Sequence, residues 1–432
     1  MTLKGKYITA LIYSFIWFLF SLLFAIPWIV EISKFVPIWI AWFVITGMAL
    51  IPGIAMSFIN ISLLMDKRPK YTELIEYPKI SIIVAAYNEQ ESIENTLISI
   101  LEQDYNNIIN IIVANDGSTD NTKNIVLNFI NKNSVENIRI VDSKYNIGKA
   151  NVLNLALKEI IDEYVITLDA DSELHPNSLK SIVNSMINKD KTYAAVAGTI
   201  LCKNYNESFI AKLQDWDYLL GISAVKRIQS MYKGTLVAQG AFSIYRRSVL
   251  EEVGGWPDKI GEDIVLSWAI LNKGYYIDHS EEAVCWTNVP ITYKVFYLQR
   301  KRWSRGLIEA FRQYPNLLLK KEMYIFFIWY NLMFPYIDIM FIFFFIPGIL
   351  AAIFFKFYLL AGSITLYLLP MTFLYSFIIF NIQKKELNKL KISMINKNVN
   401  YILYMFLYQF IMTPATLAGY ISEILKTKRV WK

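Results

Sequence analysis

Two aspartates separated by one residue, Asp169 and Asp171, give the sequence its strongest chemical signal. They directly follow residues 165–168, a short apolar run that predicts a strand. Two carboxylates this close together require a positive partner, and divalent cations bind oxygen ligands of this kind. With so few protein ligands, we expect Mg²⁺ or Mn²⁺ whose coordination is completed by water and a diphosphate. Because a D-x-D pattern is common by chance, this prediction depends on the motifs around it.

Polar residues also follow two other predicted strands. Tyr87-Asn88-Glu89 follows the apolar run 80–86, and Asn115-Asp116 follows the run 109–114. Each cluster alone would be interpreted as a turn or a helix cap, since Asn, Asp and Ser are usual turn residues. Three clusters at successive strand ends instead predict one convergent site, because ligands of parallel sheets bind at the carboxyl ends of the strands.

Further along the chain lie basic residues and a second acidic pair. Lys149 stands in a glycine-containing loop that enters a predicted helix, where its charge would assist phosphate binding; alone it would be a solvated lysine. The acidic pair is Glu262-Asp263. Residues 297–306 are basic and aromatic, as in an amphipathic helix on an anionic lipid surface. That interpretation explains the charges but not Gln299 and Trp303, which stand one helical turn apart.

The segments that would position these residues alternate between strand-like and helix-like patterns. The predicted strands are residues 80–86, 109–114, 138–141 and 165–168, and the predicted helices are residues 91–101, 121–131 and 151–161. Such alternation is typical of βαβ units with a parallel sheet covered by helices. The predicted fold class is therefore α/β.

Composition indicates a membrane protein with a soluble domain inside it. Of 432 residues, 55% are hydrophobic and only 18% are charged, and the mean hydropathy is +0.34. Two cysteines exclude a disulfide scaffold and a four-cysteine zinc site, and two histidines without an H-E-x-x-H motif exclude that class of zinc hydrolase. The net charge of +7 would suit nucleic acid or an anionic membrane surface.

Five long apolar runs predict membrane-spanning segments at the two ends of the chain. They are residues 7–30, 35–65, 323–355, 357–382 and 400–422, with a predicted turn at 31–34 between the first two. Each exceeds the roughly 20 apolar residues that cross about 30 Å of hydrocarbon. We expect two transmembrane helices in residues 1–66, a soluble domain in 67–290, an interfacial amphipathic segment in 291–322 and about three transmembrane segments in 323–432.

Basic residues in short loops predict the orientation, because Lys and Arg are enriched on the cytoplasmic side. Basic residues precede the first run, follow the second run and lie in residues 383–399, and they predict that the soluble domain is in the cytoplasm. The four basic residues in 426–432 would then lie outside. Either the last segment, broken at Pro414, re-enters without crossing, or residues 323–355 are divided at Pro335. Asp338, the single charge in that run, is either functional or the end of an interfacial helix.

In order along the chain, four motifs resemble the signature of the membrane-embedded family 2 glycosyltransferases: D, D-x-D, (T/E)-E-D and Q-x-x-R-W. They are Asp116, Asp169-x-Asp171, Glu262-Asp263 and Gln299-x-x-Arg302-Trp303. The resemblance covers about residues 75–310 and the flanking spans, and the chain looks most like the bacterial poly-β-1,6-N-acetylglucosamine synthases. It implies a GT-A-like (Rossmann-like) cytoplasmic domain inserted between transmembrane helices. Asn115 stands where the family often has a first aspartate, and Gly261 where near relatives have threonine.

The resemblance also implies the roles of individual residues. The donor nucleotide would be bound by Tyr87, Glu89, Asp116, Lys149 and Asp169, and the cation, Mg²⁺ or Mn²⁺, by Asp171 and Asp169. Asp263 would be the general base, with Glu262 beside it. The acceptor and the diphosphate would be held by Gln299, Arg302, Trp303, Gln239 and Gly240.

The implied function is processive, inverting polymerisation of N-acetylglucosamine from UDP-GlcNAc, with export of the chain across the membrane. The alternatives are a cellulose-, hyaluronan- or chitin-like synthase, a non-processive glycolipid enzyme, or a transport module without catalysis, against which Asp263 and residues 299–303 argue. The implied partners are the UDP-sugar, a growing polysaccharide or lipid acceptor, the bilayer and a small accessory membrane subunit. No nucleic acid is expected, since the basic residues lie beside the spans.

Overall fold

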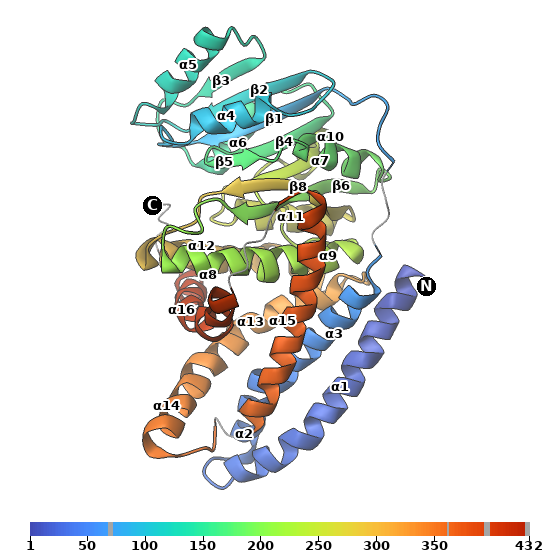
Figure 1. Ribbon diagram of the computed structural model, residues 1–432, viewed down its shortest axis with the longest axis vertical. Helices are drawn as coiled ribbons and strands as arrows, with labels where there is room; N and C mark the ends of the chain where they lie inside the picture. The colour runs from blue at the N-terminus through green and yellow to red at the C-terminus, as the bar shows by residue number, and fades with distance from the viewer. Residues whose placement is uncertain (68–71, 361–362, 393–397, 428–432) are drawn as a thin grey trace.

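The computed structural model describes residues 1–67, 72–360, 363–392 and 398–427. Figure 1 shows a sheet flanked by helices in one half of the molecule and long helices in the other half. Some basic residues that support the predicted orientation lie outside the described residues, namely Arg68, Lys70, Lys397, Lys428, Arg429 and Lys432.

The described strands form one sheet in the order β3-β2-β1-β4-β7-β6-β8-β5. Their bounds are β1 (Ile80–Ala86), β2 (Ile109–Asn115), β3 (Ile138–Asp142), β4 (Tyr164–Asp169), β5 (Ser172–Leu174), β6 (Tyr193–Cys202), β7 (Phe242–Arg246) and β8 (Tyr276–Thr287). The first four strands of this order are parallel, as predicted, whereas β7 is antiparallel to β4 and β6. The predicted α/β class is confirmed, but the sheet is mixed because β7 inserts between the two parallel parts and β5 pairs antiparallel with β8.

Apolar side chains cover both faces of the parallel strands. Ile82 and Val84 of β1 belong to the core that also contains α4 (Ile93–Leu101), α5 (Thr122–Asn133) and α7 (Ser178–Ile187). Ile83 belongs to the core that contains α6 (Lys149–Leu157) and α10 (Arg247–Val253). Strands buried on both faces have continuous apolar sequences, which is why the sequence alone located them.

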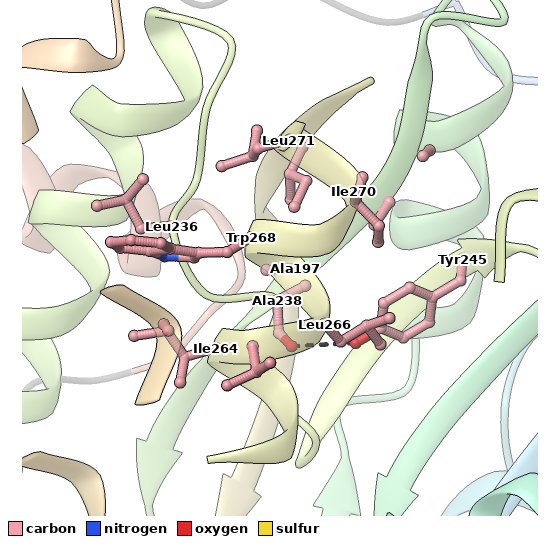
Figure 2. Packing of buried hydrophobic residues seen from close by; sticks show 14 of the residues in the cluster. Ala197, Leu236, Ala238, Tyr245, Ile264, Leu266, Trp268, Ile270 and Leu271 are labelled. Atoms are coloured by element: carbon pink, nitrogen blue, oxygen red, sulfur yellow. Dashed lines mark hydrogen bonds between the residues drawn. The ribbon is translucent and has the colours of Figure 1, made fainter. Parts of the chain in front are cut away.

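Helix α11 (Glu262–Lys273) begins with the predicted acidic pair and is buried along most of its length. Figure 2 shows its apolar side chains packed beside Ala238 and Tyr245, and the Tyr245 hydroxyl donates a hydrogen bond to the Ala238 carbonyl at 3.0 Å. Trp268 meets Phe311 of α12 (Tyr293–Gln313) edge-on, with ring centroids 4.7 Å apart. The core therefore fixes the start of α11 relative to both β7 and α12.

The apolar runs at both ends of the chain form long helices. Four of them, among the residues that the structure describes, are long and apolar enough to cross a membrane. They comprise α1 (Leu3–Ile32), α2 (Ile38–Ile45) continued by α3 (Ile51–Met65), α13 (Ile325–Met340) continued by α14 (Ile346–Phe355), and α16 (Asn398–Ile424). The predicted run 357–382 corresponds to α15 (Ser363–Lys389), and residues 361–362 of that run lie outside the described part.

One expected turn and two helix breaks that the sequence left open differ from the structure. The first turn lies at residues 33–37 because the helical hydrogen bonds of α1 continue through Ile32. Pro335 lies inside α13, and that helix continues through a π-helical turn (Phe341–Phe345) into α14. Pro414 likewise lies inside α16. A proline removes one backbone hydrogen bond, but neighbouring groups in a membrane protein often compensate, so the helix need not end there.

Helix α16 packs on the sheet-bearing domain. In Figure 1 the helices α1, α3, α14 and α15 run lengthwise below the sheet, whereas α16 is foreshortened and lies beneath α8 (Phe209–Trp216) and α12. Tyr408 packs on Phe296 of α12 with ring centroids 6.0 Å apart. Near the other end of α16, Glu423 accepts hydrogen bonds from Arg305 at 3.2 Å and from Arg312 at 2.9 Å. The contact with α12 therefore extends over much of both helices.

Candidate active site

The carboxyl ends of β1, β2 and β4 bring the three predicted clusters to one edge of the sheet. In the strand register, Ala86 pairs with Asn115 and Ala85 pairs with Asp169. Chain order reverses between β1 and β4, which is where open α/β sheets bind ligands. The convergence that the sequence predicted is present, with Tyr87 and Asp116 immediately after their strands.

Asn88 ties the segment after β1 to the loop after β2. It has a positive φ of 56°, an uncommon conformation that asparagine tolerates better than most residues. Its Oδ1 accepts a hydrogen bond from the Thr119 N–H at 2.8 Å, and its own N–H donates to Ser118 Oγ at 3.0 Å. The half-buried side chains of Tyr87 and Glu89 on either side of Asn88 are thereby held at the edge of the sheet.

Asp116 is buried and accepts two backbone hydrogen bonds. Its Oδ1 accepts from the Ile147 N–H at 2.7 Å and its Oδ2 from the Gly148 N–H at 3.1 Å. Burial raises the pKa of Asp116, and these two hydrogen bonds oppose the rise. Asp116 thus fixes the loop that leads into Lys149, and a carboxylate keeps further acceptor positions for a ligand.

Lys149, the first residue of α6, connects the D-x-D motif to the second acidic pair. Its Nζ lies 2.5 Å from Asp169 Oδ1 and 3.7 Å from Glu262 Oε1. A Cβ added to Gly240 would come within 2.9 Å of the same Nζ, so the segment with Gln239 and Gly240 lies against this cation. Burial alone would lower the pKa of Lys149, but the charges of Asp169 and Glu262 outweigh it and raise the pKa above its ordinary value.

Asp171 lies beside other carboxylates. It accepts a hydrogen bond from Thr287 Oγ1 at 3.2 Å. Burial, together with the carboxylates of Asp169 and Glu89, raises the pKa of Asp171 to about 7. Crowded carboxylates of this kind fit a divalent cation, whose charge would relieve their repulsion. Among the residues that the structure describes, no group of three or more His, Cys, Asp or Glu side chains could hold a metal ion. Any cation here therefore needs further ligands from water or a diphosphate.

Glu262 and Asp263 stand in the first turn of α11. Burial raises the pKa of Glu262 to about 7, with Lys149 opposing and Asp263 adding to the rise. Gly261 before them packs on Gly306 of α12: a Cβ at Gly261 would come within 2.6 Å of the Gly306 Cα. Glu309 Oε2 accepts hydrogen bonds from the N–H groups of Ile260 at 3.0 Å and Gly261 at 3.4 Å. The glycine that replaces the family's threonine is therefore explained by close contact between this loop and α12.

Gln299, Arg302 and Trp303 lie on α12, which packs against α11, the helix that begins with Glu262 and Asp263. Arg302 is close enough to Glu262 to lower the pKa of that carboxyl, against the effect of burial. Trp303 is 40% exposed, and its ring lies 6.4 Å from that of Tyr218. Tyr218 in turn is near Asp171: burial is the main cause that raises the pKa of Tyr218, and Asp171 contributes.

Two of the predicted acceptor residues carry a buried oxygen without a partner. The Oε1 atoms of Gln239 and Gln299 make no hydrogen bond among the described residues. Gln239 donates its own Nε2 hydrogen to the Gly198 carbonyl at 2.7 Å, which fixes the amide. Buried polar atoms are normally paired, so these two oxygens are suited to accept hydrogen bonds from a ligand.

Sequence reasoning missed several residues around this site. Tyr218 was missed, and so was Lys226 of α9 (Ala224–Met231), which is 7% exposed. Burial lowers the pKa of Lys226 to about 7, and the nearby charge of Asp263 opposes the fall. Glu309 was missed as well. None of the three belongs to a motif, and only the partly apolar surroundings of Lys226 in the sequence indicate its burial.

The described helices and strands define a GT-A-like fold. The mannosyltransferase PcManGT from Pyrobaculum calidifontis, solved in complex with GDP-Man and Mn2+, superposes with a TM-score of 0.61 at 19% identity, covering 89% of this chain and 99% of that chain. At this identity the likeness shows the fold alone.

The glycosyl transferase family 2 profile matches residues 81–254. A poly-beta-1,6-N-acetyl-D-glucosamine synthase of Staphylococcus epidermidis is 36% identical over 245 residues, which is 56% of this chain and 58% of the relative. The synthase of the same name from Staphylococcus aureus (strain COL) is 31% identical over 284 residues, 63% of this chain and 67% of the relative. The chain belongs to glycosyl transferase family 2. The match spans somewhat more than half the length of the Staphylococcus epidermidis relative.

Proposed function

We propose that the protein is an inverting glycosyltransferase that polymerises N-acetylglucosamine from UDP-GlcNAc. The observation that carries the proposal is the position of Lys149, whose Nζ pairs with Asp169 at 2.5 Å and lies 3.7 Å from Glu262. The Lys149 ammonium group therefore links the D-x-D motif, which would bind the donor diphosphate, to the Glu262-Asp263 pair, which would supply the base. The names of the Staphylococcus relatives support the choice of N-acetylglucosamine as the sugar.

In the proposed reaction, Asp263 accepts the proton of the acceptor hydroxyl as that oxygen attacks the anomeric carbon. The bond from this carbon to the diphosphate breaks on the opposite face, so the configuration is inverted. A carboxylate base within hydrogen-bond reach contributes typically 10²–10⁴-fold to such a step. Lys149 and Arg302 neutralise the charge that develops on the leaving diphosphate. A divalent cation held by Asp169 and Asp171 would add to this neutralisation when bound.

The acceptor is held between α12 and the segment before β7. The exposed ring of Trp303 offers a flat apolar surface on which the C–H face of a sugar can pack. The partnerless Oε1 atoms of Gln239 and Gln299 accept hydrogen bonds from sugar hydroxyls. Together these groups supply the mixture of apolar and polar contacts that sugar recognition requires.

We propose that the long helices hold this site at a membrane and that the polymer is exported between them; their length and apolar composition support this. We propose that residues 67–290 lie on the cytoplasmic side, that residues 291–322 lie at the interface, and that a small accessory membrane subunit assists. The contacts of Glu423 with Arg305 and Arg312 support a last segment that follows α12 without crossing the bilayer. Residues 425–427 after α16 then lie on the same side as the soluble domain, which agrees with the positive charge of Lys426.

Incubation of the purified full-length protein in detergent or vesicles with radiolabelled UDP-GlcNAc and Mg²⁺ or Mn²⁺ tests the proposal. We expect a polymer that enzymes specific for β-1,6-linked N-acetylglucosamine digest. A short labelled glycolipid would show a non-processive enzyme, and polymer made only from another UDP-sugar would identify a different synthase. No transfer from any UDP-sugar would overturn the proposal.

The variant Asp263→Asn tests the proposed base within the same assay. We expect the transfer rate to fall by about 10²–10⁴-fold, because a neutral amide cannot accept the proton. UDP binding, measured by calorimetry, should stay close to that of the unchanged protein because the nucleotide is held at the strand ends. Transfer at the unchanged rate would show that another group is the base.

A further inference from the structure

A buried ion pair joins the α12 segment that carries Gln299 and Trp303 to a different helix. Arg300 is only 2% exposed, and its Nη2 lies 3.1 Å from Asp217 Oδ2. The Tyr408 hydroxyl of α16 donates a hydrogen bond to the same Oδ2 at 2.6 Å. Asp217 begins a π-helical segment (Asp217–Ser223) that continues α8. Three elements far apart in the sequence thus meet at one carboxylate.

The Arg300 guanidinium also lies over the Trp303 ring. Its central carbon is 4.0 Å from the ring centroid, and the rings of Phe296 and Tyr218 lie 5.1 and 5.9 Å away. A guanidinium is planar, and Asp217 holds this one at Nη2, so the ion pair restricts how the planar group lies over the indole. Arg300 thus covers one side of Trp303, which is still 40% exposed.

Packing alone does not account for this arrangement. Replacing a buried ion pair by well-packed apolar residues is often neutral or stabilising, so a buried Arg–Asp pair is weak evidence for a role in stability. An apolar side chain in place of Arg300 could fill the same volume, but it would not bring a fixed planar cation to Trp303. π-Helical turns such as the one beginning at Asp217 occur frequently at functional sites.

We propose that Asp217 and Tyr408 are positioning residues that orient Trp303 for the acceptor sugar through Arg300. The inference rests on the proposed function, because it assigns Trp303 to the acceptor. It also makes α16 part of the acceptor site, since Tyr408 supplies one of the two contacts that hold the Asp217 carboxylate.

Steady-state kinetics with UDP-GlcNAc and a β-1,6-linked N-acetylglucosamine oligosaccharide as acceptor tests this proposal. Tyr408→Phe removes the hydroxyl that bonds Asp217 and should raise the acceptor KM about threefold to tenfold. Arg300→Lys keeps the charge beside Asp217 but removes the planar group over Trp303, and should raise the acceptor KM about fivefold or more. In both variants the donor KM and the thermal unfolding temperature should stay close to those of the unchanged protein.

Tyr404→Phe is the matched control: Tyr404 lies one turn earlier on α16, its ring is tilted against that of Tyr408 with centroids 5.1 Å apart, and among the described residues only Tyr408 of the two donates a hydrogen bond to Asp217. It should leave the acceptor KM unchanged. Equal acceptor KM values in Tyr408→Phe, Arg300→Lys and the unchanged enzyme would overturn the positioning role, as would a loss of kcat and stability without any change of acceptor KM. If the unchanged protein transfers no sugar at all, the proposed function itself fails, so the two failures are distinguishable.

Discussion

The contact between Gly306 and Gly261 predicts a large effect from one added methyl group. In the variant Gly306→Ala, the new Cβ would stand 2.7 Å from the Gly261 Cα and 3.2 Å from its nitrogen. Carbon atoms in contact normally lie about 3.5–4.0 Å apart, so α12 and the loop before Asp263 must separate by about 1 Å. The loop cannot move alone without weakening the hydrogen bonds that Glu309 accepts from it.

Such a separation moves the proposed base away from the acceptor residues of α12. A misplacement of about 1 Å can cost about 10²-fold in rate, so we expect kcat for transfer to fall by about that factor. The donor KM should change only a few fold, because the nucleotide is held at the ends of β1, β2 and β4. The measurement is the initial rate of incorporation from radiolabelled UDP-GlcNAc at saturating acceptor.

Val295→Ala is the control, because Val295 lies on the same helix and is 53% exposed. It should keep both the rate and the unfolding temperature. A folded Gly306→Ala protein with kcat within threefold of the unchanged enzyme would refute the argument that the spacing of these two elements sets the geometry of the site.

Three further predictions concern the charges of the site. Lys149→Met leaves Asp169 and Glu262 without their shared cation, and should weaken UDP binding in calorimetry and lower kcat by about 10²–10³-fold; unchanged UDP affinity would contradict it. Burial raises the pKa of Glu262 from an ordinary 4.5 to about 7 in the folded protein, so the folded state favours the protonated carboxyl. The contribution of Glu262 to the free energy of unfolding is therefore fully present below pH 4.5 and is lost as the pH rises through 7. Glu262→Gln should therefore raise the unfolding temperature at pH 8, corresponding to at most about 3 kcal/mol, and raise it much less at pH 5; an equal shift at both pH values would refute this. Asp171→Asn should abolish the stimulation of transfer by Mn²⁺ without lowering the unfolding temperature, and undiminished stimulation would remove Asp171 from the metal site.

The parallel part of the fold could be predicted because local sequence determines it. The strands from β1 to β4 are buried on both faces, so their apolar runs were recognisable, and the polar residues at their ends had to meet once the strands were parallel. The later strands were not predicted. β7 runs antiparallel between β4 and β6, and that pairing depends on contacts between segments far apart in the chain.

The missed residues share one physical cause, which is that their chemistry depends on tertiary neighbours. Asp217 is an ordinary helix residue in the sequence, and it becomes notable only because Arg300 and Tyr408 lie beside it. Gly261 was recognised as a departure from the family pattern, but its partner Gly306 is distant in sequence, so the reason for a glycine could not be inferred.

These contacts make α12 a shared wall between the proposed base, the acceptor and the C-terminal helix. One part of α12 presses Gly306 against the loop before Asp263, another presents Trp303, and a third places Arg305 against Glu423 with both side chains nearly buried. Removing α16 would take away the partner of Arg305 and would expose apolar side chains of α12 such as Phe296, which is fully buried and packs on Tyr408. The soluble domain and α16 therefore form one structural unit, and a fragment that ends before α16 should lose the geometry of α12 before it loses the strand-end donor site.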